Sequence, residues 1–187
     1  MYTKEQKQQL LNLARKSIVH YLKEKKFLEL GPDEYPLELQ EKRGTFVTIT
    51  VDGQLRGCIG HVIATQPLYL DVIENAVHSA FEDPRFYPLA DEEFENVKIE
   101  ISVLSSPEPL AYKDADDLLK KLRPDVDGVI IRKDFYQATF LPQMWEQLKR
   151  PEDFLSHLCA KAGLDSNAWR KGDLQVQTYQ VENFEEE

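Results

Sequence analysis

The sequence predicts a mixed fold in which helices and strands are interleaved within a single compact body. Amphipathic helical segments alternate along the chain with β-branched segments of strand length. No segment repeats at a fixed period, and no low-complexity linker divides the 187 residues. Hydrophobic residues make up 42% of the chain, which is enough to build a packed core. We therefore expect one domain over residues 1–187, with its weakest joint at the proline-containing segment 107–109.

The first predicted element is an amphipathic helix over residues 4–26. Thr3 and Gln6 match a capping box, and apolar residues then recur at steps of three and four. The segment 31–36 contains two prolines and a glycine, which end the helix and lead through residues 37–39 into a long loop.

A β-hairpin is predicted next. Residues 45–51 are β-branched and aromatic, Asp52 and Gly53 suit a tight turn, and residues 54–60 form the return strand. Glycines are poor strand formers, so Gly57 and Gly60 mark a bulge or a place where another backbone or a ligand comes close.

The remaining elements follow from periodicity and from breaker residues. Pro67 suits the first turn of a second helix, which the sequence Asp83-Pro84 ends. Apolar and polar residues alternate over 97–103, as in a strand with one buried face. The later patterns predict helices at 114–122 and 151–162, strands at 128–132, 137–141 and 174–184, a helical turn at 142–149 and a frayed tail at 185–187.

Composition excludes several classes of protein. There are 23 Lys and Arg against 33 Asp and Glu, so the net charge is −10 and generic nucleic-acid binding is not expected. Two cysteines are too few for a disulfide scaffold and suit a reducing compartment, so we expect a cytoplasmic protein. The first six residues are polar, and no apolar run is long enough for a membrane span, so neither secretion nor membrane insertion is expected.

Residues 55–61 concentrate the features of a reactive site. Cys58 becomes a useful nucleophile if positive charge lowers the pKa of its thiol, and Arg56 and His61 are the local cations. In a regular strand Arg56 and Cys58 share a face, whereas Cys58 and His61 point to opposite faces unless a bulge at Gly60 re-aims them. The alternative is that Cys58 is a small buried residue of the hairpin.

Metal and nucleotide sites are not predicted. Cys58 and His61 have the spacing of half a zinc site, but no second half lies nearby. The chain also lacks the glycine-rich phosphate loops, the GxSxG nucleophile motif and the HExxH zinc motif.

Two further segments hold candidate residues. Asp83 and Arg85 follow a helix end in a segment whose path two prolines fix, and they either point into a cleft or form a rigid cap. Where a strand leads into a helix start, Thr139 and Gln143 could add hydrogen bonds to an anion held by backbone amides. The alternative there is a plain strand-to-helix turn with Trp145 packed in the core.

Taken together, these segments resemble the AMMECR family, which in microbes is also called AmmeMemoRadiSam system protein A. His61 departs from the family pattern, in which threonine is common, and this argues against His61 as the base that serves Cys58. Five ordered matches cover nearly the whole chain: LRGCIG at 55–60, AFEDPRF at 80–86, ISVLS at 101–105, ATFLPQ at 138–143 and CAKAGL at 159–164.

The resemblance implies an α+β fold of a larger and a smaller lobe, in which helices flank a mixed or antiparallel sheet and the hexapeptide lies near a cleft. It also implies a modification system with a Memo-like protein and a radical-SAM enzyme as partners. It specifies no reaction, cofactor or oligomeric state.

Within that picture, Cys58 would act as thiolate nucleophile or transient carrier. Arg56 would stabilise the thiolate or bind an anionic group, and Asp83 would orient Arg85. The ligand-binding residues would be Gly57, Gly60, Thr139 and Gln143. The alternatives are a non-catalytic adaptor that binds a partner's peptide or a small ligand, and a factor for RNA modification.

Overall fold

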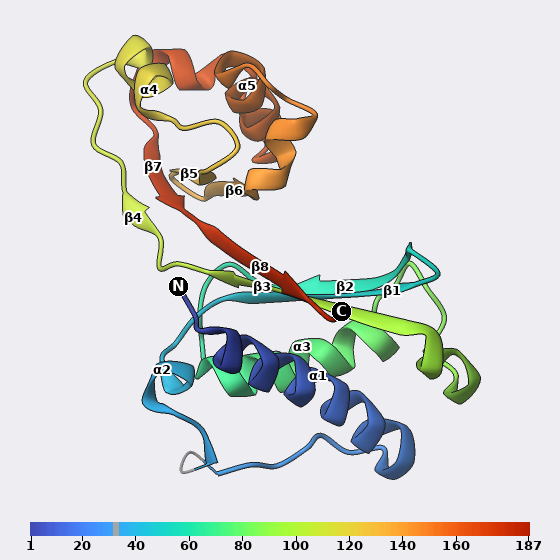
Figure 1. The fold of residues 1–187 in the computed structure, drawn as a ribbon. Helices are drawn as coiled ribbons and strands as arrows, with labels where there is room; N and C mark the ends of the chain where they lie inside the picture. Colours follow the sequence, from blue (N-terminus) through green and yellow to red (C-terminus); the bar gives the residue numbers. More distant parts are fainter. Residues whose placement is uncertain (32–33) are drawn as a thin grey trace. The chain divides into compact units, whose positions relative to one another are not determined.

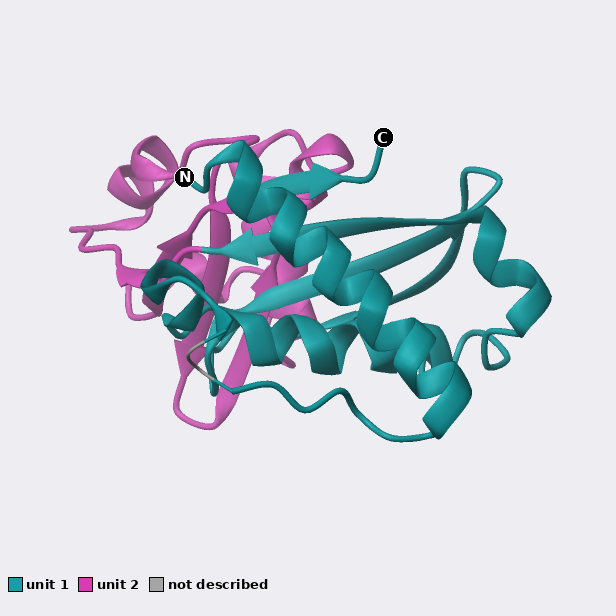
Figure 2. Cartoon of the chain, turned by 60° about the horizontal axis from the view of Figure 1, so that its bottom comes forward, with its two compact units in different colours: residues 1–104, 182–187 teal, residues 105–181 magenta. Residues whose placement is uncertain are grey.

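The chain folds into two compact units, which a computed structural model describes over residues 1–31 and 34–187 (Figure 1). Unit 1 comprises residues 1–104 and 182–187, and unit 2 comprises residues 105–181 (Figure 2). The chain therefore passes from unit 1 to unit 2 after Leu104 and returns after Val181. Both units combine helices with antiparallel strands, so the expected α+β class is confirmed.

Unit 1 contains a four-stranded sheet with two long helices on one face. The strands lie in the order β2-β1-β3-β8, so β2 is an edge strand. In Figure 1, α1 and α3 both lie on the same side of this sheet, and each of them contacts it. The elements are α1 (Lys4–Glu24), α2 (Leu37–Gln40), β1 (Thr45–Val51), β2 (Gln54–Gly60), α3 (Leu68–Phe81), a 3₁₀ helix (Asp91–Asn96), β3 (Val97–Leu104) and β8 (Val181–Glu185).

The core of unit 1 lies between the sheet and these helices. Alternate residues of β1 and β3, such as Val47 and Ile101, are fully buried because they face α1 and α3. The intervening residues, such as Thr48 and Glu100, belong to the opposite face and are partly exposed. The alternation predicted for residues 97–103 is therefore present over residues 97–101, whereas Ser102, expected on the polar face, is buried.

Unit 2 contains a second antiparallel sheet, in the order β4-β7-β5-β6. Its core is aromatic: Trp145 stacks on Phe154 with ring centroids 3.7 Å apart, and Trp169 is fully buried. The elements are β4 (Glu108–Pro109), α4 (Ala115–Lys121), β5 (Gly128–Lys133), β6 (Tyr136–Phe140), a 3₁₀ helix (Pro142–Glu146), α5 (Pro151–Lys161), a 3₁₀ helix (Ala168–Lys171) and β7 (Gln175–Tyr179).

Most predicted elements are present at their expected places. The capping box of α1 forms in full, because the Thr3 hydroxyl accepts from the N–H of Gln6 and the Gln6 side chain accepts from the N–H of Thr3. Asp52 and Gly53 both have positive φ, as the predicted tight turn of the hairpin requires. Part of the predicted breaker segment 31–36, residues 32 and 33, lies outside the described residues.

Three predictions about elements were wrong. Residues 174–184 are not one strand but two, β7 and β8, which break at Gln180 and belong to different sheets. Residues 37–40 form a short helix. The tail does not fray throughout, because Glu186 pairs with the Arg15 guanidinium and accepts from the N–H of Ile99 at 3.0 Å.

Candidate functional site

Cys58 lies on the edge strand β2, paired across the ladder with Thr48. Both residues are on the face of the sheet opposite to α1 and α3, and the cysteine is partly exposed. The Thr48 hydroxyl donates to Sγ of Cys58 at 3.2 Å. Cys159 of unit 2 is fully buried, and this burial raises the pKa of its thiol. The two cysteines therefore differ sharply in access.

The backbone of Cys58 is held on its outer side by two side chains. Its N–H donates to Oδ2 of Asp83 at 2.9 Å, and its carbonyl accepts from Nη2 of Arg85 at 3.3 Å. A neighbouring strand would satisfy the same two backbone groups, so Asp83 and Arg85 take the place of a strand at this edge. They fix the main chain of the residue that carries the thiol.

Asp83 and Arg85 form a two-pronged ion pair with one buried and one exposed member. The Nε–Oδ1 and Nη2–Oδ2 distances are 3.0 and 2.7 Å. The Arg85 guanidinium holds the pKa of the Asp83 carboxyl well below its usual range, and the N–H groups of Cys58 and Arg85 add to this effect. The Asp83 side chain is only 2% exposed, whereas that of Arg85 is 54% exposed. The positive member of the pair therefore faces solvent.

Arg56 is the extra residue of a β-bulge, which lies here rather than at Gly60. Its guanidinium makes a bidentate pair with Glu93 at 2.9 and 3.0 Å, and Nη1 donates to the carbonyl of Tyr87 at 2.9 Å. Arg56 also lowers the pKa of the Glu93 carboxyl. The cation nearest to Cys58 in sequence is therefore engaged with the 3₁₀ helix that precedes β3, while Arg85 contacts Cys58 itself.

Gly57 and Gly60 both mark close backbone approaches, one of the two readings that the sequence left open. A Cβ at Gly57 would lie 2.0 Å from the carbonyl oxygen of Ser79, and one at Gly60 would lie 2.1 Å from that of Thr45. Only glycine allows α3 and β1 to come this close to β2.

A stripe of polar residues along α3 was missed by sequence reasoning. Its first two members bond to one threonine of β1: the Thr45 hydroxyl donates to Asp71 at 2.6 Å, and Nδ2 of Asn75 donates to Thr45 Oγ1 at 2.9 Å. All members are buried, and their fixed spacing of four on an apolar helix was the available signal. The stripe consists of Asp71, Asn75 and Ser79, and the same spacing of four leads to the predicted site residue Asp83 just after the end of the helix.

The third member of the stripe joins α3 to both strands of the hairpin. The Ser79 hydroxyl donates to the carbonyl of Val47 at 2.7 Å and accepts from the N–H of Ile59 at 3.2 Å. Because Val47 and Ile59 are partners in the β1–β2 ladder, this hydroxyl bridges the two strands beside Gly57. The polar stripe thus positions the strand that carries Cys58.

His61 faces Asp71. Its Nε2 lies 2.7 Å from Oδ1 of Asp71, at ion-pair distance but without the alignment of a hydrogen bond. Asp71 is fully buried, and this burial raises the pKa of its carboxyl. The imidazole is thus a partner of α3, in keeping with the argument against His61 as the base for Cys58.

Thr139 and Gln143 belong to unit 2, whereas the other predicted site residues belong to unit 1. The Thr139 hydroxyl donates to the carbonyl of Val129 and lies 3.0 Å from the Tyr179 hydroxyl, while Gln143 is exposed. Trp145 is fully buried and donates to the carbonyl of Asp127. The tryptophan thus packs in the core as the alternative reading expected, while a ligand-binding role of Thr139 and Gln143 stays a prediction.

In the described part of the chain, no group of three or more His, Cys, Asp or Glu side chains is arranged to hold a metal ion. Within residues 1–31 and 34–187, no helix is long and apolar enough to cross a membrane.

Comparison with known proteins places this site in a family. A solved structure, that of the uncharacterized protein PH0010 from Pyrococcus horikoshii, matches 99% of this chain and 93% of its own with a TM-score of 0.84 and 38% identity. A protein of Thermococcus gammatolerans is 38% identical over 95% of this chain and 89% of its own length. NEQ441 of Nanoarchaeum equitans is 40% identical over 95% of this chain and 99% of its own length. The model of the AMMECR1 family matches residues 11–184, and the chain therefore belongs to that family.

Proposed function

We propose that this protein is the thiol-bearing component of an enzymatic modification system. In this proposal Cys58 is the nucleophile, or the transient carrier of a group that is transferred. The observation that carries it is a partly exposed cysteine in a fixed place: Cys58 is not buried, while its backbone is held at both its N–H and its carbonyl. A structural cysteine needs burial and no such support.

The surroundings of Cys58 support thiolate chemistry. Arg85 supplies a fixed positive charge that contacts the cysteine through its carbonyl, and the Thr48 hydroxyl donates to the sulfur. A nearby positive charge and a hydroxyl donor are groups that a thiolate nucleophile needs around it. Arg56 is assigned a positioning role, because its contacts with Glu93 and the Tyr87 carbonyl tie the segment after α3 to β2.

The partners belong to the same proposal. A Memo-like protein and a radical-SAM enzyme are the partners that the resemblance to AmmeMemoRadiSam system protein A implies. With them, the protein would receive or present the group on which the system acts.

The first test is the rate at which iodoacetamide labels Cys58 at pH 7 in a Cys159→Ser background. We expect the folded protein to react about tenfold faster than the same protein unfolded in urea, because the folded chain holds the Cys58 thiol beside the Thr48 hydroxyl and the Arg85 guanidinium. A folded protein whose Cys58 resists labelling would exclude the nucleophile. In a reaction reconstituted with both partners, Cys58→Ser should abolish group transfer.

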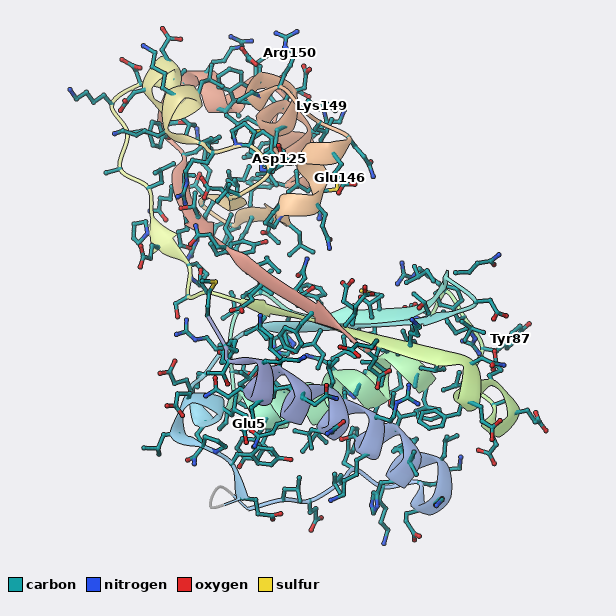
Figure 3. All side chains as sticks on the ribbon, viewed as in Figure 1. Glu5, Tyr87, Asp125, Glu146, Lys149 and Arg150 are labelled. Atoms are coloured by element: carbon teal, nitrogen blue, oxygen red, sulfur yellow. The ribbon has the colours of Figure 1, made fainter. Side chains whose placement is uncertain are left out.

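A non-catalytic adaptor is the second candidate, and exposed apolar side chains beside the site favour it. Tyr87 is 89% exposed and Leu55 is 44% exposed. Figure 3 shows Tyr87 pointing away from the ribbon of unit 1. Arg56 holds the backbone that carries this ring, because its Nη1 donates to the Tyr87 carbonyl. An adaptor predicts full activity for Cys58→Ser in the reconstituted system and weaker partner binding for Tyr87→Ala.

A further inference from the structure

One edge of the Arg85 guanidinium is left open. Its Nε and Nη2 atoms are used by Asp83 and by the carbonyl of Cys58. No residue in the described part of the chain accepts a hydrogen bond from Nη1, and the side chain is 54% exposed. An arginine nitrogen of this kind carries two N–H donors. The guanidinium therefore presents unused donors to solvent beside a candidate nucleophile.

The neighbouring arginine differs in this respect. Arg56 donates from Nε, Nη1 and Nη2 to Glu93 and to the Tyr87 carbonyl, and its side chain is only 15% exposed. A ligand would have to break the pair with Glu93 to bind there. Of the two arginines, Arg85 is the one that can accept a ligand without rearrangement.

The acidic partner of Arg85 does not obstruct an incoming anion. Both oxygens of Asp83 already accept hydrogen bonds, from Arg85 and from the N–H of Cys58. The carboxylate is buried, so an anion on the outer side would meet the guanidinium first. The net charge of −10 repels anions at long range, so binding must depend on these local donors.

We propose that the substrate of Cys58 carries an oxyanion, a carboxylate or a phosphate, which binds the open edge of Arg85. The proposal rests on the proposed function, because it concerns the ligand of the same thiol. The hydrogen bond between Nη2 of Arg85 and the Cys58 carbonyl ties the anion site to the nucleophile. A reactive carbon next to the anionic group would thus lie close to the sulfur. The ring of Phe86, whose centroid is 5.5 Å from the guanidinium carbon, offers an apolar surface alongside.

Two alkylating reagents with the same reactive carbon test this proposal. In both iodoacetate and iodoacetamide the thiolate attacks the CH₂ carbon, the C–I bond breaks and iodide leaves with the electron pair. The rate with iodoacetate divided by the rate with iodoacetamide does not depend on the thiolate fraction, because both reagents react with the same thiolate. This ratio therefore reports only the effect of the carboxylate. We expect this ratio for Cys58, in the Cys159→Ser background, to exceed the ratio for N-acetylcysteinamide about threefold.

Variants assign the effect to one arginine. Arg85→Gln should bring the ratio down to that of the small thiol, and Arg85→Lys should retain part of it. Arg150→Gln is the matched control: Arg150 is 71% exposed, belongs to unit 2, and its loss changes the net charge equally. If Arg150→Gln lowered the rate ratio as much as Arg85→Gln does, the effect would come from net charge alone and the proposed anion site would be wrong.

Competition on the otherwise unaltered protein keeps the test valid if Arg85→Gln fails to fold. At constant ionic strength, inorganic phosphate or acetate should slow iodoacetate more than iodoacetamide, and the stronger competitor identifies the anion as phosphate-like or carboxylate-like. If neither anion competes and the ratio equals that of the small thiol, the anion site is refuted while a fast iodoacetamide reaction still upholds the nucleophile. If iodoacetamide itself does not react, both proposals fail.

Discussion

At the scale of single residues, the site depends on one buried carboxylate. Asp83 meets the N–H of Cys58 and the guanidinium of Arg85, so removal of its charge affects two other residues. Asp83→Asn keeps an oxygen for the N–H but leaves Arg85 without its counter-charge. We expect a loss of about 2 kcal/mol in the free energy of unfolding at pH 7, because the partner arginine is half exposed and partly resolvated.

The pH dependence of that loss has a definite sign. The pKa of Asp83 is lower in the folded protein than its unfolded value of about 3.9. The ionised carboxylate therefore contributes fully to the free energy of unfolding at pH values above about 3.9. The contribution disappears as the pH falls toward the folded pKa. Urea unfolding of the native protein and of Asp83→Asn should therefore give curves that differ at pH 7 and approach one another near pH 3. An equal difference at both pH values would contradict the assigned ion pair.

Single-residue chemistry could be predicted from the sequence only in part. Cys58, Asp83 and Arg85 were identified as candidates by residue type and by resemblance, and the structure brings these three together. The hydrogen bonds that connect the three residues could not be predicted from the sequence, because Asp83 lies 25 positions from the N–H that it binds. Arg56 was assigned by its nearness in sequence, but the bulge and Glu93 give it another contact.

At the scale of elements, the approach of α3 to β2 controls where Cys58 lies. Gly57→Ala would place its Cβ 2.0 Å from the backbone oxygen of Ser79, so the helix or the strand must shift. We expect a loss of about 3 kcal/mol in the free energy of unfolding and slower labelling of Cys58, since the Ser79 bridge would be disturbed. Urea unfolding and iodoacetamide kinetics measure the two effects.

Gly31→Ala provides the control for this substitution. The nearest atom to a Cβ at Gly31 is a side-chain oxygen of Glu34 at 4.0 Å, so the change should cost little. If Gly57→Ala is as stable as Gly31→Ala and reacts at the native rate, the close packing of α3 on β2 does not set the position of the thiol.

Elements defined by local signals were the ones that the sequence could predict. The capping box of α1 and the alternation in β3 depend on neighbours in the chain; the first is confirmed in full and the second over residues 97–101. The chain breaks between β7 and β8 because the two strands join different sheets. The strands with which they pair lie far away in the sequence. Residues 174–184 contain no glycine or proline that would mark a break, so the sequence pattern joined the two strands into one. At Gln180 the N–H donates to the Ser105 side chain instead of continuing one ladder.

At the scale of the whole molecule, unit 1 is built from both ends of the chain. Its sheet is completed by β8, and the Glu182 carboxylate pairs with Lys7 of α1 at 2.8 Å. Glu186 makes a two-pronged contact with Arg15, whose Nη2 also donates to the carbonyl of Val97. Glu182 and Glu186 thus bind α1 to the sheet that carries Cys58, although both are far from Cys58 in the sequence.

This arrangement predicts that a change in the tail weakens unit 1. Glu186→Gln should lower the free energy of unfolding of that unit by about 1 kcal/mol, since the ion pair is only partly shielded from water. Two probes separate the units: Cys58 lies in unit 1, whereas Trp145 and Trp169 both lie in unit 2. In urea, the midpoint of Cys58 exposure, followed by labelling in a Cys159→Ser background, should fall.

The same titration followed by tryptophan fluorescence shows how far the loss spreads. Because Glu186 bonds to Arg15 and Ile99, both in unit 1, we expect the fluorescence midpoint of Glu186→Gln to shift less than the labelling midpoint. Glu187→Gln is the matched control, since it removes one carboxylate from the neighbouring tail position. An unchanged labelling midpoint would mean that β8 holds its place without the Glu186 contacts. Equal shifts of both probes would mean that the two units unfold as one cooperative structure.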